Sequence, residues 1–186
     1  RGRLYTAGPG NSALRARMSD DHQAALEALA AEVGQLLVRN GEKLATAESC
    51  TGGWVGQCLT AIDGSSCWFE RGFITYSNAA KIELLGVGAD TLAAHGAVSE
   101  AIAAAMALGA VQHSHADWAL AITGIAGPGG GSPDRPVGTV CFAWTGPKRR
   151  IDTDTRHFQG DREAVRAQSV AHALTGILQR ARHGLA

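Results

Sequence analysis

The run from Trp118 to Ile125 is the feature that most restricts how this chain can fold. Its residues are apolar almost without interruption, and such a short run is typical of a fully buried strand. A strand that is apolar on both sides must be covered on both sides, as strands of parallel sheets usually are. The run therefore predicts a sheet that lies between two layers of helices.

Strand-like and helix-like segments alternate along the chain. Strands separated by helices predict a parallel sheet, and the last two strands, as a hairpin, predict that one strand runs antiparallel. We predict a single three-layer α/β/α domain with a mostly parallel, mixed sheet. The expected strands are 43–47, 68–76, 118–125, 137–144 and 152–158. The first expected helix follows a cap signal at 19–21, and the others span 51–62, 78–85, 89–94, 99–113 and 161–182. Asn78 is the expected N-cap of the helix 78–85.

The start of the chain differs from the rest. Residues 1–17 contain Gly, Pro, Asn and Arg without apolar periodicity, and Met18 follows them. We expect this segment to be a leader before a native start at Met18, or else a natural flexible arm. The remaining residues, 18–186, are enough for one domain with a core of its own.

Charge and cysteine content limit the partners that can be expected. Seventeen basic and seventeen acidic residues cancel, so no strong overall field favours nucleic acid or a membrane. There is no apolar run long enough to cross a bilayer and no secretory signal, and four cysteines without metal-site spacing favour a reduced, cytoplasmic protein. His113 and His115 form the only close histidine pair, and no neighbouring residue completes a metal site, so we expect neither metal nor cofactor.

Three polar stretches follow predicted strands, at 48–53, 75–81 and 123–128. In open parallel sheets, ligands bind beyond the carboxyl ends of the strands, which all lie at one edge. We therefore expect the three stretches to meet at one site.

The first stretch combines a potential nucleophile with a helix start. Ser49 precedes Gly52 and Gly53, where a ligand could approach the backbone and its free amides closely. An ordinary N-cap explains the same residues without any function. Cys50 could be a reactive thiol at a helix start, but with no histidine in the three stretches a packing role is the better interpretation.

A serine hydroxyl needs a base, and the second stretch offers one. Lys81, partly desolvated in a cleft, could lose its proton near neutral pH. Tyr76 could project into the same space. The alternative is a solvated surface lysine and an aromatic residue at the rim.

The third stretch could complete the site. Thr123 and the amide of Gly124 could form an oxyanion hole or hold a substrate amide. The glycine-rich loop 126–136 could serve as a lid or as a cradle for a ribose phosphate, with Arg135 pairing with the phosphate. A plain connecting loop and a solvated arginine are the alternatives.

The assembled residues closely resemble the CinA C-terminal-domain family, whose characterised members are nicotinamide-nucleotide amidohydrolases. The resemblance extends over about residues 19–178. The segments that carry it are Ala47–Gly53, Trp68–Phe73, Tyr76–Asn78, Lys81, His95–Glu100, Thr123–Pro128 and Pro136–Thr139.

This resemblance implies a three-layer fold and hydrolysis of the carboxamide of nicotinamide mononucleotide to nicotinate mononucleotide and ammonia, without a cofactor. It implies Ser49 as nucleophile, Tyr76 and Lys81 as its activators, and Thr123 at the reacting carbonyl. A homodimer is expected from the family alone. The expected substrate-binding residues are Glu48, Cys50, Thr51, Gly52, Gly53, Asn78, Gly124, Gly127 and Arg135.

Two other functions fit the same residues. The chain could be a nucleotide-binding module without activity, or a serine amidohydrolase of another small carboxamide. A partner protein in DNA uptake or repair is a third and weaker alternative, and the balanced charge gives it no support.

Overall fold

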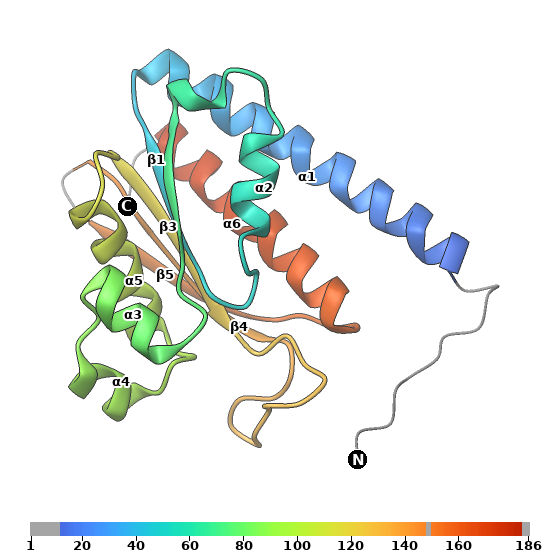
Figure 1. Cartoon of the computed structure of the whole chain (residues 1–186), viewed down its shortest axis with the longest axis vertical. Coiled ribbons are helices and arrows are strands. Elements are labelled where there is room, and N and C mark those ends of the chain that lie inside the picture. Colours follow the sequence, from blue (N-terminus) through green and yellow to red (C-terminus); the bar gives the residue numbers. More distant parts are fainter. Residues whose placement is uncertain (1–11, 148–149, 184–186) are drawn as a thin grey trace.

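The computed structural model describes residues 12–147 and 150–183 and shows one five-stranded sheet between helices (Figure 1). The strands are β1 (Leu44–Glu48), β2 (Phe69–Ile74), β3 (Trp118–Gly124), β4 (Thr139–Thr145) and β5 (Ile151–His157). The helices are α1 (Ser12–Asn40), α2 (Trp54–Thr60), α3 (Asn78–Leu85), α4 (Ala89–His95), α5 (Glu100–Gln112) and α6 (Arg162–His183), with a short 3-10 helix at Ser65–Cys67.

The sheet has the order β2-β1-β3-β4-β5. β1 pairs in parallel with both β2 and β3, whereas β4 is antiparallel to β3 and to β5. Four strands therefore run one way and β4 runs the other way. The predicted α/β fold with a mostly parallel, mixed sheet is confirmed.

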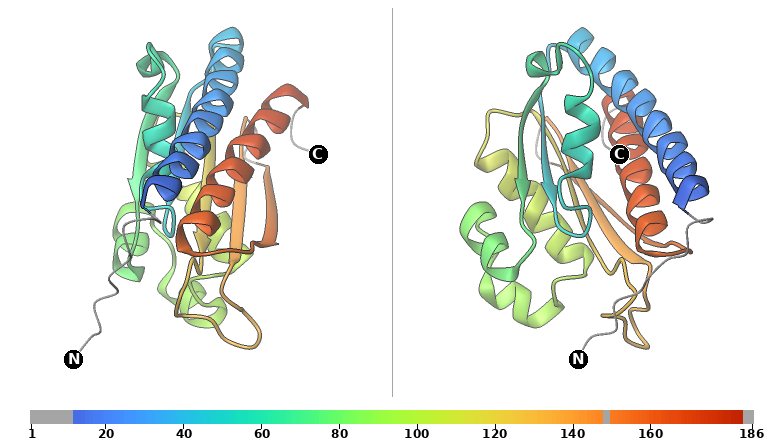
Figure 2. Two further views of the ribbon diagram at one scale, coloured as in Figure 1. Left: turned by 90° about the vertical axis from the view of Figure 1, so that its right-hand side faces the viewer. Right: turned by 45° about the vertical axis from the view of Figure 1, so that its right-hand side comes forward.

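Helices cover both faces of the sheet, as the two further views in Figure 2 show. α1, α2 and α6 pack on one face, and α3, α4 and α5 on the other. Successive residues of a strand point to opposite faces, so in β3 Leu120 and Ile122 enter the first core while Ala119 and Ala121 enter the second. The apolar run of β3 is buried on both sides for this reason.

The second face of the sheet is lined with small side chains, which let α5 approach closely. Ala45, Ala47 and Ala143 belong to this core together with buried alanines of α5. The alanine-rich helix therefore packs on the sheet.

Three predicted boundaries were wrong. α1 begins at Ser12, seven residues before the expected cap at Ser19, because the intervening residues are mostly good helix formers; residues 1–11 of the expected leader or arm lie outside the described residues. Ser77, not Asn78, caps α3, and its side chain accepts a hydrogen bond from the N–H of Ala80. α2 begins only at Trp54, because the two residues before it have positive φ angles that a right-handed helix does not allow.

Candidate active site

The carboxyl ends of β2, β1 and β3 lie side by side, and the three polar stretches follow them. The β1 residue Glu48 is opposite both Ile74 of β2 and Ile122 of β3. Hydrogen bonds continue beyond the strand ends, from the Ser49 N–H to the Ile122 carbonyl (3.0 Å) and from the Thr75 N–H to the Glu48 carbonyl (2.8 Å). The expected meeting of the three stretches at one edge is confirmed.

A cavity of about 240 Å³ opens at this edge. Its lining joins residues from all three stretches with two from the loop after α4 and one from α6. Seven of the predicted site residues are among them. The lining consists of Ser49, Cys50, Tyr76, Asn78, Lys81, Ala97, Val98, Thr123, Gly124, Ala126 and Arg162.

Ser49 and Lys81 form a buried polar pair in this cavity. The Lys81 Nζ donates hydrogen bonds to the Ser49 Oγ at 3.0 Å and to the Thr75 carbonyl at 2.8 Å. Lys81 is 1% exposed and Ser49 is 8% exposed. The sequence could not decide between a buried and a solvated lysine, and the structure places Lys81 in the interior.

The surroundings of Lys81 favour its neutral form. Burial removes water from the ammonium group and lowers the pKa of Lys81 below its ordinary value. The ion pairs found among the described residues do not include Lys81, so no carboxylate offsets this effect. A neutral amine 3.0 Å from a serine hydroxyl can act as a general base.

Glu48 does not point into the cavity; it caps α2 from the end of β1. Its Oε2 accepts hydrogen bonds from the Thr51 hydroxyl (2.7 Å) and from the N–H groups of Gly53 (3.0 Å) and Val55 (3.1 Å), and its Oε1 accepts one from the N–H of Gly56 (2.9 Å). The carboxylate thus occupies the amides that an anion would bind at a helix start.

The expectation that Gly52 and Gly53 offer free amides to a substrate was therefore wrong. The Gly53 N–H is bound by Glu48, and the Gly52 N–H donates to the Ser49 carbonyl at 3.1 Å. Gly53 is needed for its backbone, since its φ of 96° is left-handed and a side chain there would also meet Ile74.

Cys50 lines the cavity but is buried beside Ser49. Burial raises the pKa of the Cys50 thiol to about 12, so it stays protonated at neutral pH. This agrees with the packing role inferred from the sequence rather than with a second nucleophile.

Tyr76 and Thr123 line the cavity, but their hydroxyls are bound elsewhere. The Tyr76 side chain is 63% exposed, and its hydroxyl accepts a hydrogen bond from Arg162 at 2.8 Å. The Thr123 hydroxyl donates to the Ala97 carbonyl at 2.7 Å. In this arrangement neither hydroxyl is hydrogen-bonded to Ser49 or Lys81, so the expected activation of Ser49 by Tyr76 has no contact to support it.

The loop residues expected to hold phosphate lie differently. Arg135 donates to the His95 carbonyl at 2.8 Å and lines neither of the two cavities at this edge. The Gly127 carbonyl accepts a hydrogen bond from Arg162 at 2.8 Å. Gly124 is required by packing, because a side chain there would meet Val140 and the Thr139 carbonyl.

A second, larger cavity of about 850 Å³ adjoins the first. Both are lined by Ala126 and Arg162. No role was predicted for Arg162, nor for Arg166, which also lines the larger cavity. One feature of the sequence could have indicated a role for Arg162. It is the first residue of a helix, where a positive charge is unfavourable because of the helix dipole, so its presence there suggests a function.

Within residues 12–147 and 150–183 no group of three or more His, Cys, Asp and Glu side chains could hold a metal ion. In the same part of the chain no helix has the length and apolar character needed to span a membrane.

Fold and site together define an α/β domain with a buried serine–lysine pair at the carboxyl edge of its sheet. The chain belongs to the CinA C-terminal domain family, whose profile matches residues 26–181.

Three relatives illustrate this membership. The chain is 53% identical to the nicotinamide-nucleotide amidohydrolase PncC of Escherichia coli K12, over 81% of this chain and 92% of the relative. It is 50% identical to PncC of Pseudomonas putida, over 81% and 94%. The crystal structure of the competence/damage inducible protein CihA from Agrobacterium tumefaciens superposes with a TM-score of 0.80 at 42% identity, covering 83% of this chain and 94% of that one.

Proposed function

We propose that this chain hydrolyses the carboxamide of nicotinamide mononucleotide to nicotinate mononucleotide and ammonia, as part of pyridine nucleotide salvage. The observation that carries the proposal is the buried Lys81 Nζ, 3.0 Å from the Ser49 Oγ, in a cavity open to substrate. The names of the PncC relatives support the choice of substrate, since the chain covers 92% and 94% of two of them.

Ser49 is the proposed nucleophile. Its Oγ attacks the carboxamide carbon while its proton passes to the neutral Lys81 amine. When the carbon–nitrogen bond breaks, Lys81 returns this proton to the departing nitrogen, which leaves as ammonia. A water molecule then attacks the Ser49 ester, gives its proton to Lys81, and releases the nicotinate nucleotide as the serine takes that proton back.

Negative charge develops on the carbonyl oxygen in both steps and needs N–H donors. Because Gly52 and Gly53 use their amides within the protein, we assign this role to the N–H groups of Cys50 and Gly124, two residues that line the cavity. Each such donor contributes roughly 3 kcal/mol to transition-state stabilisation in comparable sites. We also propose that Thr123 lies beside the reacting carbonyl of the substrate.

Arg162 is the proposed partner of the substrate phosphate. It lines both cavities, and its two hydrogen bonds go to the neutral oxygens of Gly127 and Tyr76. Arg162 is absent from the ion pairs of the described residues, so its charge is available to an anion. A guanidinium between the cavities suits a substrate whose amide enters the small one and whose phosphate stays outside.

Ammonia release from nicotinamide mononucleotide tests the proposal. We expect turnover in the natural protein and a loss of about 10²–10⁴-fold or more in Ser49→Ala and Lys81→Met. Free nicotinamide should react far more slowly, because binding of the phosphate contributes to the transition state. Tight nucleotide binding without turnover would indicate a binding module, and equal rates on both amides would indicate another carboxamide as substrate.

Two further proposals concern the oligomeric state of the protein and its location in the cell. We propose a homodimer, because Ile74, Ile82 and Leu84 of β2 and α3 are exposed together with Tyr76; light scattering after gel filtration tests this. We also propose the cytoplasm as its location, with which the four unpaired cysteines agree.

A further inference from the structure

The loop that carries Ser49 is held from two sides by opposite charges. On one side the Glu48 carboxylate binds the N–H groups at the start of α2. On the other side Arg166 of α6 binds carbonyls of the same loop: its Nε donates to the Cys50 carbonyl (3.2 Å) and one Nη to the Thr51 carbonyl (2.7 Å). Arg166 thus joins the last helix of the chain to the two residues that follow the nucleophile.

The Cys50 and Thr51 carbonyls of this loop have few other hydrogen-bonding partners. Gly52 and Gly53 have positive φ values of 62° and 96°, which only residues without a side chain adopt easily. Among the backbone hydrogen bonds described, the Cys50 carbonyl has no partner, and the Thr51 carbonyl has one long bond, from the N–H of Trp54 at 3.3 Å. Without the guanidinium, two carbonyl dipoles beside Ser49 would lose their main partner.

Arg166 is itself held in place by an aromatic ring. Its guanidinium lies over the Trp54 ring, 5.1 Å from the ring centre, and the Trp54 indole N–H is bound by Gln23 at 2.7 Å. A planar cation stacked in this way keeps its hydrogen-bonding direction, which a lysine cannot reproduce. The positive charge also reaches the loop, where it acts to lower the pKa of Cys50 against the larger effect of burial.

We propose that Arg166 is a positioning residue for the nucleophile: by binding the Cys50 and Thr51 carbonyls, it keeps the Ser49 hydroxyl within reach of Lys81. This inference rests on the proposed function of Ser49 as nucleophile. It gives Arg166 no contact with the substrate, although Arg166 also lines the larger cavity. The alternative is that Arg166 binds the substrate or only stabilises the fold.

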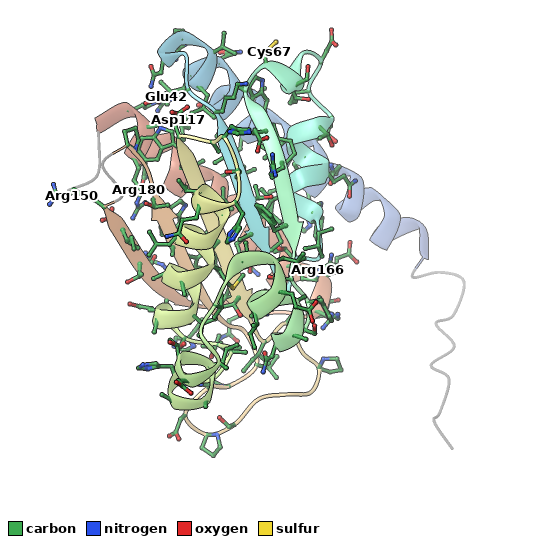
Figure 3. The ribbon with its side chains drawn as sticks, turned by 60° about the vertical axis from the view of Figure 1, so that its left-hand side comes forward. Glu42, Cys67, Asp117, Arg150, Arg166 and Arg180 are labelled. Carbon is green, nitrogen blue, oxygen red and sulfur yellow. The ribbon has the colours of Figure 1, made fainter. Side chains whose placement is uncertain are left out.

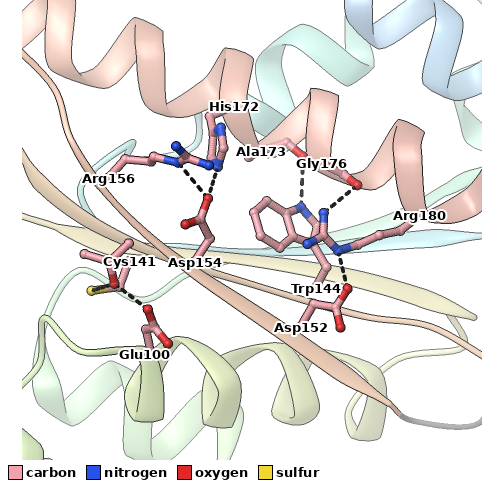
Figure 4. Close-up of polar contacts among 11 residues, drawn as sticks. Glu100, Cys141, Trp144, Asp152, Asp154, Arg156, His172, Ala173, Gly176 and Arg180 are labelled. Carbon is pink, nitrogen blue, oxygen red and sulfur yellow. Dashed lines mark hydrogen bonds and ion pairs between the residues drawn. The ribbon is translucent and has the colours of Figure 1, made fainter. Parts of the chain in front are cut away.

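The chain provides a matched control on the same helix. Arg180 is stacked over Trp144 (4.0 Å), donates to the Gly176 carbonyl (3.1 Å) and pairs with Asp152 (2.9 Å), as Figure 4 shows. Arg166 and Arg180 lie at separate places along α6 (Figure 3), about 21 Å apart by helical rise. Arg180→Met therefore removes a stacked arginine with a similar set of bonds, but away from the site.

The test compares Arg166→Met, Arg166→Lys and Arg180→Met with the natural protein. For each we would measure melting temperature, kcat and KM for nicotinamide mononucleotide, and the rate at which phenylmethylsulfonyl fluoride modifies Ser49, followed by intact mass. In that reaction the Ser49 oxygen bonds to sulfur while the hydroxyl proton and fluoride are lost. It reports on the serine without any nucleotide.

We expect Arg166→Met to lower kcat and the Ser49 modification rate by about 10–100-fold, with KM within about threefold. Arg166→Lys should recover only part of this, because it can bind one carbonyl well but not both. Arg180→Met should lower the melting temperature to a similar degree and leave kcat and the modification rate unchanged.

A raised KM in Arg166→Met with normal kcat and modification rate would overturn the inference and make Arg166 a substrate ligand. A lower melting temperature alone would overturn it in favour of a purely structural role. No modification of Ser49 in the natural protein would also overturn it. If the natural protein does not act on nicotinamide mononucleotide but its Ser49 modification depends on Arg166, the inference stands and the proposed substrate fails.

Discussion

Glu48→Gln is the substitution whose effect the structure predicts most directly. The side chain is 1% exposed, and its carboxylate accepts one hydroxyl and three backbone N–H hydrogen bonds. Glutamine has the same shape but only one acceptor oxygen. If this oxygen takes the place of Oε2, which accepts three of the four bonds, the new NH₂ group faces the N–H of Gly56, and neither donor has an acceptor there.

The expected cost has two parts. A buried donor left without a partner costs about 1–3 kcal/mol. Removing the negative charge from the start of α2 costs about 0.5–2 kcal/mol, because the helix dipole no longer has its counter-charge. We therefore expect Glu48→Gln to lower the free energy of unfolding by about 1.5–5 kcal/mol, a large share of the stability of an ordinary domain.

Urea unfolding followed by tryptophan fluorescence measures this change. Glu100→Gln is the control, because within the described part of the chain Glu100 accepts hydrogen bonds only from the hydroxyls of Thr153 and Thr155. Hydroxyls can rotate and accept bonds from the new NH₂ group, so no donor is left unpaired. The control also removes a negative charge from the start of α5, but Glu100 is exposed, so this loss should cost only about 0.3–1 kcal/mol. In Glu48→Gln, KM for the nucleotide should stay within about twofold. A strongly raised KM with unchanged stability would refute the capping role and restore Glu48 as a substrate ligand.

Three further predictions concern the site. Burial lowers the pKa of Lys81 below the 10.5 of an exposed lysine, so between these two pKa values the unfolded chain binds more protons than the folded one and the stability of the natural protein rises with pH. Lys81→Met lacks this rise, so the amount by which its urea midpoint exceeds that of the natural protein should shrink as the pH approaches 10.5. A difference between the two midpoints that stays constant with pH would contradict the burial of Lys81. Tyr76→Phe should raise KM for the nucleotide by about 2–10-fold with little change in kcat, because the hydroxyl binds Arg162 and not Ser49, and a large fall in kcat would show instead that Tyr76 takes part in the chemistry. Ellman's reagent should titrate one thiol quickly in the folded protein, the exposed Cys67, and all four after unfolding, while fast reaction and loss of activity at Cys50 would contradict a protonated thiol.

Much of the architecture could be predicted because it depends on local patterns. The nearly continuous apolar runs of β3 and β4, which are buried on both faces, the serine before α5 and Gly86 after α3 all leave direct marks in the sequence. The boundaries that failed depend on single residues. Gly52 and Gly53 interrupt a helix pattern that otherwise runs through them, and periodicity does not record φ angles.

The site was predictable in its chemistry but not in its contacts. Strand order brings Ser49, Lys81 and Thr123 to one edge, and the sequence indicates this because parallel strands end at the same side of a sheet. The contacts of Glu48 and Tyr76 could not be predicted, because a carboxylate or a phenol near a predicted nucleophile does not show which donor it binds.

The sequence by itself determined the layers, the mixed sheet and the types of group at its carboxyl edge, because periodic patterns and strand-end motifs are local properties. Only the tertiary structure decided that Lys81 is buried without a carboxylate, that Glu48 caps α2, and that Arg162 and Arg166 reach the site from the last helix. These features depend on contacts between residues as many as 116 positions apart, such as Arg166 and Cys50. Burial and charge at such contacts are set by the packing of the whole domain, and no short segment records them.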